Sequence, residues 1–133
     1  HIMALAVYHE TSEVITGDLA TPIKYFNQKI NGAYKEIEDI AENKMLSFLP
    51  EDFREDYRPL IKGHESEEYR YVKAADRISA YIKCIEELKS GNQEFAKAKE
   101  NIEASIHAMQ LPCVEYFMEN FIPSYFLTLD ELN

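Results

Sequence analysis

The sequence of 133 residues has no tryptophan and contains only two cysteines, four glycines and five prolines. So few glycines and prolines argue against a fold with many tight turns and favour long helices. The two cysteines, Cys84 and Cys113, do not make a disulfide framework, so we expect a reduced, cytoplasmic protein. Cys84 lies inside a helical pattern, which is typical of a small buried hydrophobe.

Positive charge is also scarce. Fourteen Lys and Arg residues stand against 24 Asp and Glu residues, which gives a formal net charge of −10. Recognition of nucleic acid or of an anionic membrane needs clustered cations, so this balance argues against both partners. It remains compatible with a small phosphorylated substrate that is held through a metal. No apolar run is long enough to span a bilayer, and the N-terminus does not resemble a signal peptide.

Apolar residues at helical spacing are abundant, and 46% of the chain is hydrophobic, as in globular proteins. No segment shows the sustained alternation of a strand. We therefore predict an all-α fold with one domain over residues 1–133, in which residues 1–2 are a cloning scar before Met3. The predicted helices cover residues 4–15, 22–47, 50–63, 67–90, 95–109 and 111–121.

Four side chains that can bind a metal or transfer a proton fall within ten positions: His9, Glu10, Glu13 and Asp18. If the first helix extends to Ile15, the first three crowd one side of one turn. A glycine then ends the helix and brings Asp18 back near its end. Buried acids and imidazoles must be satisfied by a metal ion or by salt bridges. The spacing alone predicts a candidate metal or acid–base site and leaves an ordinary polar cluster open.

Asp76 lies in the longest predicted helix, on or beside its apolar stripe. The ordinary interpretation is an acid paired with Lys73 or Arg77. Small residues such as Ala75 surround it, however, and an acid among alanines on an inner face has room for a ligand or an ion.

Thr21 followed by Pro22 predicts the start of the second helix, with Thr21 as its N-cap. Lys24 then lies in the first turn, where the helix dipole disfavours a positive charge. It is either solvated or directed at an anionic substrate, and we retain it as a candidate substrate-binding residue.

Five stretches together carry a family resemblance: AVYHETSEV at 6–14, TGDLATPIKYFN at 16–27, VKAAD at 72–76, AYIKCIEEL at 80–88 and YFMENFIPS at 116–124. Through them the chain resembles the bacterial HD-domain 5′-deoxynucleotidases, which hydrolyse deoxynucleoside monophosphates to deoxynucleosides and phosphate. The resemblance implies an HD-like helical bundle, a deoxynucleoside monophosphate substrate and a homodimer or larger homo-oligomer. It also implies one divalent metal ion, and imidazole and carboxylate ligands suit Mn, Co, Zn or a similar ion.

The resemblance implies a role for each candidate residue. His9 matches the His of the family's His-Asp pair, Glu10 stands where the family has the Asp, and Asp76 matches a distant metal-binding Asp. Glu13 matches the acid that handles the attacking water. Asp18 matches a second active-site acid near the substrate.

Two departures from the family pattern lead us to expect weak or absent activity. The extra methylene of Glu10 moves its carboxylate by about one carbon–carbon bond, whereas ligand distances are held to roughly 0.2 Å. The chain also starts after the family's upstream helices, which carry another metal-binding His, an Arg for the phosphate and the residues that exclude a 2′-hydroxyl. The alternative is a non-catalytic helical scaffold or interaction protein that keeps the HD fold.

The first predicted helix is apolar on several faces, a pattern typical of a helix that other elements cover. Exposed apolar patches of a few hundred Å² usually mark contacts between proteins. We therefore expect an assembly that covers this helix, and we expect Leu5→Glu to disrupt it.

Overall fold

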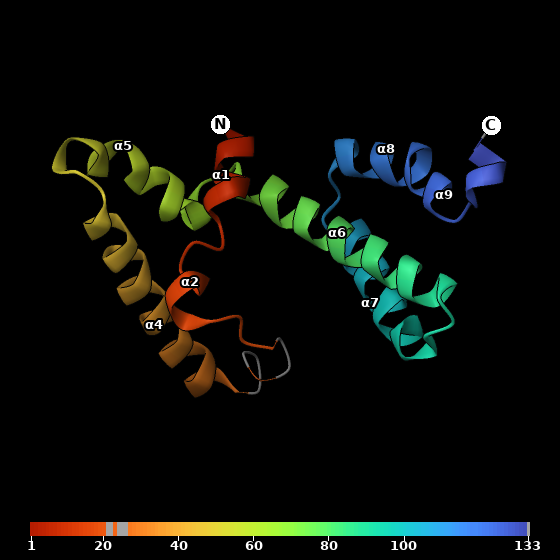
Figure 1. The fold of residues 1–133 in the computed structure, drawn as a ribbon, viewed down its shortest axis with the longest axis horizontal. Coiled ribbons are helices and arrows are strands. Elements are labelled where there is room, and N and C mark those ends of the chain that lie inside the picture. The colour runs from red at the N-terminus through yellow and green to blue at the C-terminus, as the bar shows by residue number, and fades with distance from the viewer. Residues whose placement is uncertain (21–22, 24–26, 133) are drawn as a thin grey trace. The chain divides into compact units, whose positions relative to one another are not determined.

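The computed structural model describes residues 1–20, 23 and 27–132 (Figure 1). These residues form helices, turns and connecting segments with no strand among them, which confirms the predicted all-α class. No helix within the described part of the chain combines the length and the apolar character that a membrane crossing requires.

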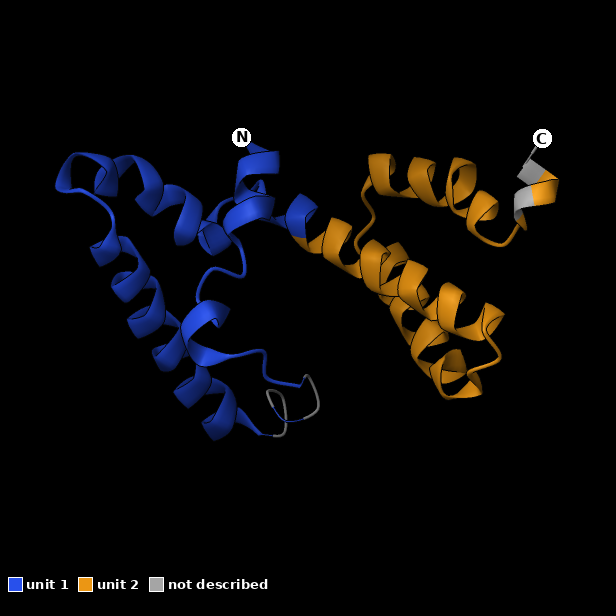
Figure 2. Cartoon of the chain, in the orientation of Figure 1, with its two compact units in different colours: residues 1–72 blue, residues 73–133 orange. Residues whose placement is uncertain are grey.

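The chain divides into two compact units, His1–Val72 and Lys73–Asn133 (Figure 2). The division falls inside a long helix, α6 (Tyr69–Lys89), whose first turn belongs to unit 1.

Unit 1 is built from α1 (Ile2–Tyr8), α2 (Glu13–Thr16), α4 (Gln28–Phe48), α5 (Glu51–Ile61) and the short 3₁₀ turn η1 (Gly63–Glu65). Helix α5 is central to the unit, because α1, α4 and η1 all pack against it, while α2 packs on α4. Its apolar core consists of Leu5, Tyr34, Ala41, Leu46, Ile61 and Val72.

The first helix is shorter than predicted, and the expectation of one helix over 4–15 is wrong. Helix α1 ends at Tyr8 and α2 begins at Glu13. Between them the Thr11 hydroxyl donates to the Tyr8 carbonyl at 2.6 Å, and the Glu13 amide donates to the Glu10 carbonyl at 2.9 Å. The side-chain bond of Thr11 competes with the helical ladder, and together with the backbone bond it closes a turn over residues 9–12.

Helix α4 begins later than predicted. The Asn27 backbone is extended, and its side chain accepts a hydrogen bond from the Ile30 amide at 2.9 Å, which makes Asn27 the N-cap. The predicted start at Thr21 and Pro22 lies outside the described residues, as does Lys24.

Leu5 is fully buried, with 0% of its surface exposed, so it does not belong to the exposed apolar surface that we expected on this helix. The outward face of α1 carries Met3 and Val7 instead, which are 80% and 72% exposed. Val14 of α2 is similarly exposed. Leu5→Glu would therefore break the core of unit 1 and is not a probe of assembly.

Unit 2 continues α6 and adds η2 (Gln93–Phe95), α7 (Ala96–His107), α8 (Pro112–Asn120), α9 (Ile122–Tyr125) and η3 (Leu129–Leu132). Its buried apolar residues are Ala74, Tyr81, Cys84, Ile85, Ile106, Leu111, Val114, Met118 and Ile122. Burial raises the pKa of the Cys84 thiol, which confirms this cysteine as a core residue.

Candidate metal and acid–base site

His9 caps the C-terminal end of α1, and its ring is oriented by the helix that precedes it. The Nδ1 atom lies 2.7 Å from the Ala6 carbonyl oxygen. A carbonyl oxygen can only accept a hydrogen bond, so Nδ1 is the donor. In the neutral imidazole this leaves the lone pair on Nε2, which is the form in which histidine binds metals.

The Nε2 atom of His9 is buried and has no hydrogen-bond partner among the described residues. The nearest charged atom is Oε1 of Glu10, which is 3.5 Å away. A lone pair facing a carboxylate is unfavourable unless a proton or a cation lies between them. Two ligand atoms about 2.1 Å from one tetrahedral ion are separated by roughly 3.4 Å. The spacing of these two atoms therefore fits a shared metal ion, and it also fits an ion pair if the imidazole is protonated.

Glu13 is the first residue of α2 and is half-buried. The turn over residues 9–12 separates it from His9, so the predicted grouping of His9, Glu10 and Glu13 on one helical turn is wrong. The predicted break after α2 is confirmed, because Gly17 ends this helix with φ of +71°. Asp18 follows it and is exposed.

Asp76 lies on α6, in unit 2, and its side chain is exposed. The neighbouring Ala74 is buried, so Asp76 stands beside the apolar stripe and outside the core. The sequence left open a salt bridge to Arg77. In the structure the Arg77 guanidinium donates to the Ser105 carbonyl at 2.9 Å, which accounts for that cation within unit 2.

Unit 1 also holds an ionisable cluster that the sequence did not predict. Glu42 of α4 is buried, burial raises the pKa of its carboxyl group, and His64 Nδ1 lies 3.6 Å from Glu42 Oε1. The nearby Lys62 ammonium hydrogen-bonds Asp39 and lowers the pKa of that carboxyl group. The signal in the sequence was Glu42 beside Ala41 on an otherwise apolar helix face. These groups join α4 to the segment after α5.

In unit 2 an open cavity of about 350 Å³ is lined by Tyr81, Lys99, Glu103, His107, Met118, Glu119, Ile122, Pro123 and Phe126. Several of its polar groups are already paired. Lys99 Nζ lies 3.2 Å from Glu103, and His107 Nδ1 lies 2.7 Å from Glu115. Because these charged groups pair within unit 2, we assign them a role in stabilising the fold.

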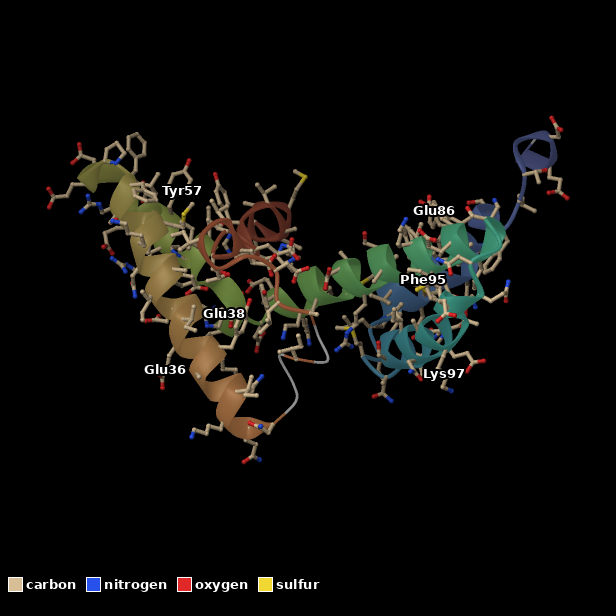
Figure 3. The ribbon with its side chains drawn as sticks, turned by 60° about the horizontal axis from the view of Figure 1, so that its bottom comes forward. Glu36, Glu38, Tyr57, Glu86, Phe95 and Lys97 are labelled. Carbon is tan, nitrogen blue, oxygen red and sulfur yellow. The ribbon has the colours of Figure 1, made fainter. Side chains whose placement is uncertain are left out.

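The aromatic contact between Tyr8 and Tyr57, which is labelled in Figure 3, attaches the residue before His9 to α5. The ring centroids are 5.5 Å apart and the rings meet edge to face. The hydrogen bond between the two side chains raises the pKa of the Tyr8 hydroxyl. His9 therefore follows a residue that is fixed to the centre of the unit.

Comparison with known proteins gives consistent results. Residues 1–125 match the family described as YfbR-like 5′-deoxynucleotidases. The chain is 50% identical to a 5′-deoxynucleotidase of Photobacterium profundum, over 99% of this chain and 69% of that protein. It is 49% identical to the 5′-deoxynucleotidase YfbR of Escherichia coli, over 99% of this chain and 67% of that protein. A 5′-deoxynucleotidase of Shewanella oneidensis is 48% identical over 98% of this chain and 68% of that protein.

Proposed function

We propose a function for this chain from the premise that it belongs to the YfbR-like 5′-deoxynucleotidase family. It is a phosphohydrolase that converts deoxynucleoside 5′-monophosphates to deoxynucleosides and phosphate, with one divalent metal ion such as Mn, Co or Zn. The family relationship supports this function over a non-catalytic scaffold.

The observation that carries the proposal is the state of the His9 imidazole. Its Nδ1 is committed to the Ala6 carbonyl, and its buried Nε2 has no hydrogen-bond partner among the described residues. Together with the Glu10 carboxylate 3.5 Å away, it offers one nitrogen and one oxygen ligand at a separation suited to a single ion. The residues present therefore fit a divalent metal. A bound metal ion of this kind polarises phosphoryl oxygens and lowers the pKa of a bound water.

The remaining roles follow the family resemblance. Asp76 supplies the third metal ligand, which is the role that the family resemblance gives it. Glu13 takes the proton of the attacking water, which is a task suited to a half-buried carboxylate. Asp18, exposed in the loop after α2, and Lys24, which lies outside the described residues, contact the substrate.

The decisive experiment combines metal analysis with a phosphate-release assay. We expect the chain, stripped of metal and reloaded with Mn or Co, to bind one ion and to release phosphate from deoxynucleoside monophosphates at a low rate, in keeping with the two departures from the family pattern. Chelation with EDTA should abolish the release. A chain that binds no metal and releases no phosphate would support the scaffold and contradict the proposal.

We also propose a cytoplasmic homodimer or larger homo-oligomer that has no nucleic-acid or membrane partner. The net charge of −10 disfavours polyanionic partners, and the exposed Val7 and Val14 side chains supply apolar surface for self-association. Light scattering of the parent chain and of Val7→Glu tests the assembly. A monomeric parent, or an assembly that is indifferent to Val7→Glu, would contradict the role of this surface.

A further inference from the structure

We infer that Gly63 is a positioning residue for the metal-binding imidazole, because its missing side chain sets how closely α1 lies against η1 and thereby where His9 is held. This inference rests on the proposed metal-dependent function. It assigns a task to a residue outside the candidate site, in a turn that supplies no ligand.

Gly63 begins η1 and is buried, with the side chain of Leu5 of α1 beside it. A Cβ atom built at this position would lie 2.3 Å from Cδ2 of Leu5 and 3.7 Å from its Cγ. Carbon atoms in contact prefer separations of about 3.5–4.0 Å, so the shorter distance is a severe overlap. Leu5 is 0% exposed, so its branched end can shift only against the side chains packed around it. In a closely packed core such an overlap is relieved by side-chain and backbone shifts together, and here the backbone concerned is that of α1.

The displacement would reach His9 over a short path. Leu5 is followed by Ala6, and the Ala6 carbonyl is the acceptor that holds Nδ1 of His9 at 2.7 Å. A movement of α1 at Leu5 therefore moves the group that fixes the tautomer and direction of the imidazole. Three residues after Leu5, Tyr8 contacts Tyr57 of α5, so the helix cannot move as a rigid rod without straining a second contact.

Steric room, and not backbone conformation, accounts for the glycine at position 63. Gly17 and Gly91 have positive φ angles, of +71° and +89°, whereas Gly63 is not among the residues with positive φ. Gly32, within α4, has nothing within 4 Å of the position where a Cβ would stand. Gly32→Ala is therefore a matched control that adds the same methyl group in open space.

The test places Gly63→Ala in two backgrounds, the parent chain and Leu5→Ala, and titrates each folded variant with Co²⁺ while the visible absorption of the bound ion is followed. We expect Gly63→Ala in the parent to retain its helical circular dichroism and to bind Co²⁺ about tenfold more weakly, as for other residues that orient a metal ligand. In the Leu5→Ala background the added methyl group occupies the space that the leucine left. There Gly63→Ala should change the affinity by less than about threefold, which measures the coupling between the two positions. Gly32→Ala should leave the affinity unchanged.

A readout without metal separates positioning from general stability. The ¹⁵N shifts of the His9 ring report which nitrogen carries the proton, and Gly63→Ala should reduce the population with the proton on Nδ1. Equal affinity and an unchanged ring spectrum in folded Gly63→Ala would overturn the inference. So would an equal loss in the two backgrounds.

Failure to fold also has a defined meaning. If Gly63→Ala is unfolded but the double variant folds and binds Co²⁺ like Leu5→Ala, the coupling is supported; if both are unfolded while Leu5→Ala alone folds, it is overturned. Failure of the proposed function gives a different pattern, in which the parent chain does not bind Co²⁺ or His9→Ala binds it equally well. The ring spectrum of the metal-free chain then still decides whether Gly63 positions His9.

Discussion

His9 in unit 1 and His107 in unit 2 both lie at the C-terminal end of a helix, yet they differ in what their free nitrogens meet. His107 Nδ1 lies 2.7 Å from the Glu115 carboxylate, in a pair that is half-exposed and complete. The Nδ1 atom of His9 donates to the Ala6 carbonyl of its own helix, and Nε2 is buried without a hydrogen-bond partner among the described residues. The ring of His107 is therefore paired with a carboxylate, whereas Nε2 of His9 keeps a lone pair that can bind a ligand.

Glu103 of unit 2, like His107, has its interaction partners within its own unit. Glu103 of unit 2 bonds both Lys99 and Tyr81. Burial alone would raise the pKa of the Glu103 carboxyl group, but these hydrogen bonds and the charges of Lys99 and His107 together lower it. Burial raises the pKa of the Tyr81 hydroxyl, and the Lys99 ammonium lies 4.9 Å from the centre of that ring. Such a network stabilises a fold and has little capacity left for chemistry.

The largest effect on turnover and metal binding is expected from removing the His9 imidazole. His9→Ala should lower turnover by more than about 100-fold and abolish stoichiometric metal binding, because loss of a ligand exceeds the cost of losing a residue that only orients one. His107→Ala is the matched control and should retain both metal and turnover. Elemental analysis and phosphate release measure the two quantities. Equal losses of metal and turnover in both variants would contradict the proposed difference between His9 and His107.

A second pair of variants compares the acids. Glu13→Ala should lower turnover by about 100- to 10,000-fold, the usual contribution of general acid–base catalysis, with metal content and melting temperature nearly unchanged. Glu103→Ala should keep turnover and lose about 1 kcal/mol of stability, because Lys99 and Tyr81 lose an acceptor. If Glu13→Ala instead loses metal or unfolds, its role is structural.

A smaller effect is expected from the length of the Glu10 side chain. Glu10→Asp restores the ligand that the resemblance implies and should raise metal affinity by roughly 3- to 10-fold, because ligand distances tolerate little error. Isothermal titration with Mn or Co compares the two forms. Equal or weaker binding by the aspartate variant would remove Glu10 from the ligand set, and His9 would then have no adjacent carboxylate ligand.

The smallest effect concerns Glu42, the buried acid of unit 1. Burial raises the pKa of its carboxyl group above 4.5, against the opposing charges of His64 and Lys62 and with the help of Asp39 and Glu38. The protonated form is thus favoured by folding, and its contribution is complete below the unfolded pKa and is lost as the pH rises through the folded pKa.

Glu42→Gln removes this dependence. At about pH 7 the variant should be more stable than the parent by about 1 kcal/mol or less, and the difference should vanish near pH 4. Urea unfolding at both pH values measures it. A less stable variant at neutral pH would show that ionised Glu42 and His64 form a stabilising pair like the pairs of unit 2.

The sequence predicted the elements that carry strong local signals. Helix α5 follows Pro50 and ends before Gly63, and α8 starts at Pro112, as expected from start and stop residues. The turn after His9 was missed because it is closed by local bonds, among them that of the Thr11 hydroxyl to the Tyr8 carbonyl. No periodicity reveals that choice.

Which face of each helix is buried was harder to predict. On α4 the apolar repeat includes Ile37 and Ile40, yet both are exposed while Tyr34 and Ala41 are buried. Which side of an apolar helix is covered depends on the elements that pack against it, which local spacing does not contain. For the site, residue types and family resemblance named the candidates, but the tautomer of His9 follows from a bond that only the folded chain shows.

The close approach of Gly63 to Leu5 has a consequence for sequence variation. The two positions share one volume, since a methyl group at 63 would overlap the leucine side chain. Among relatives with this packing, a larger residue at the position of Gly63 should be accompanied by a smaller one at the position of Leu5. Substitutions at the two positions should therefore covary in size, and alanine or a larger residue at 63 should be found where the partner has lost its branched end.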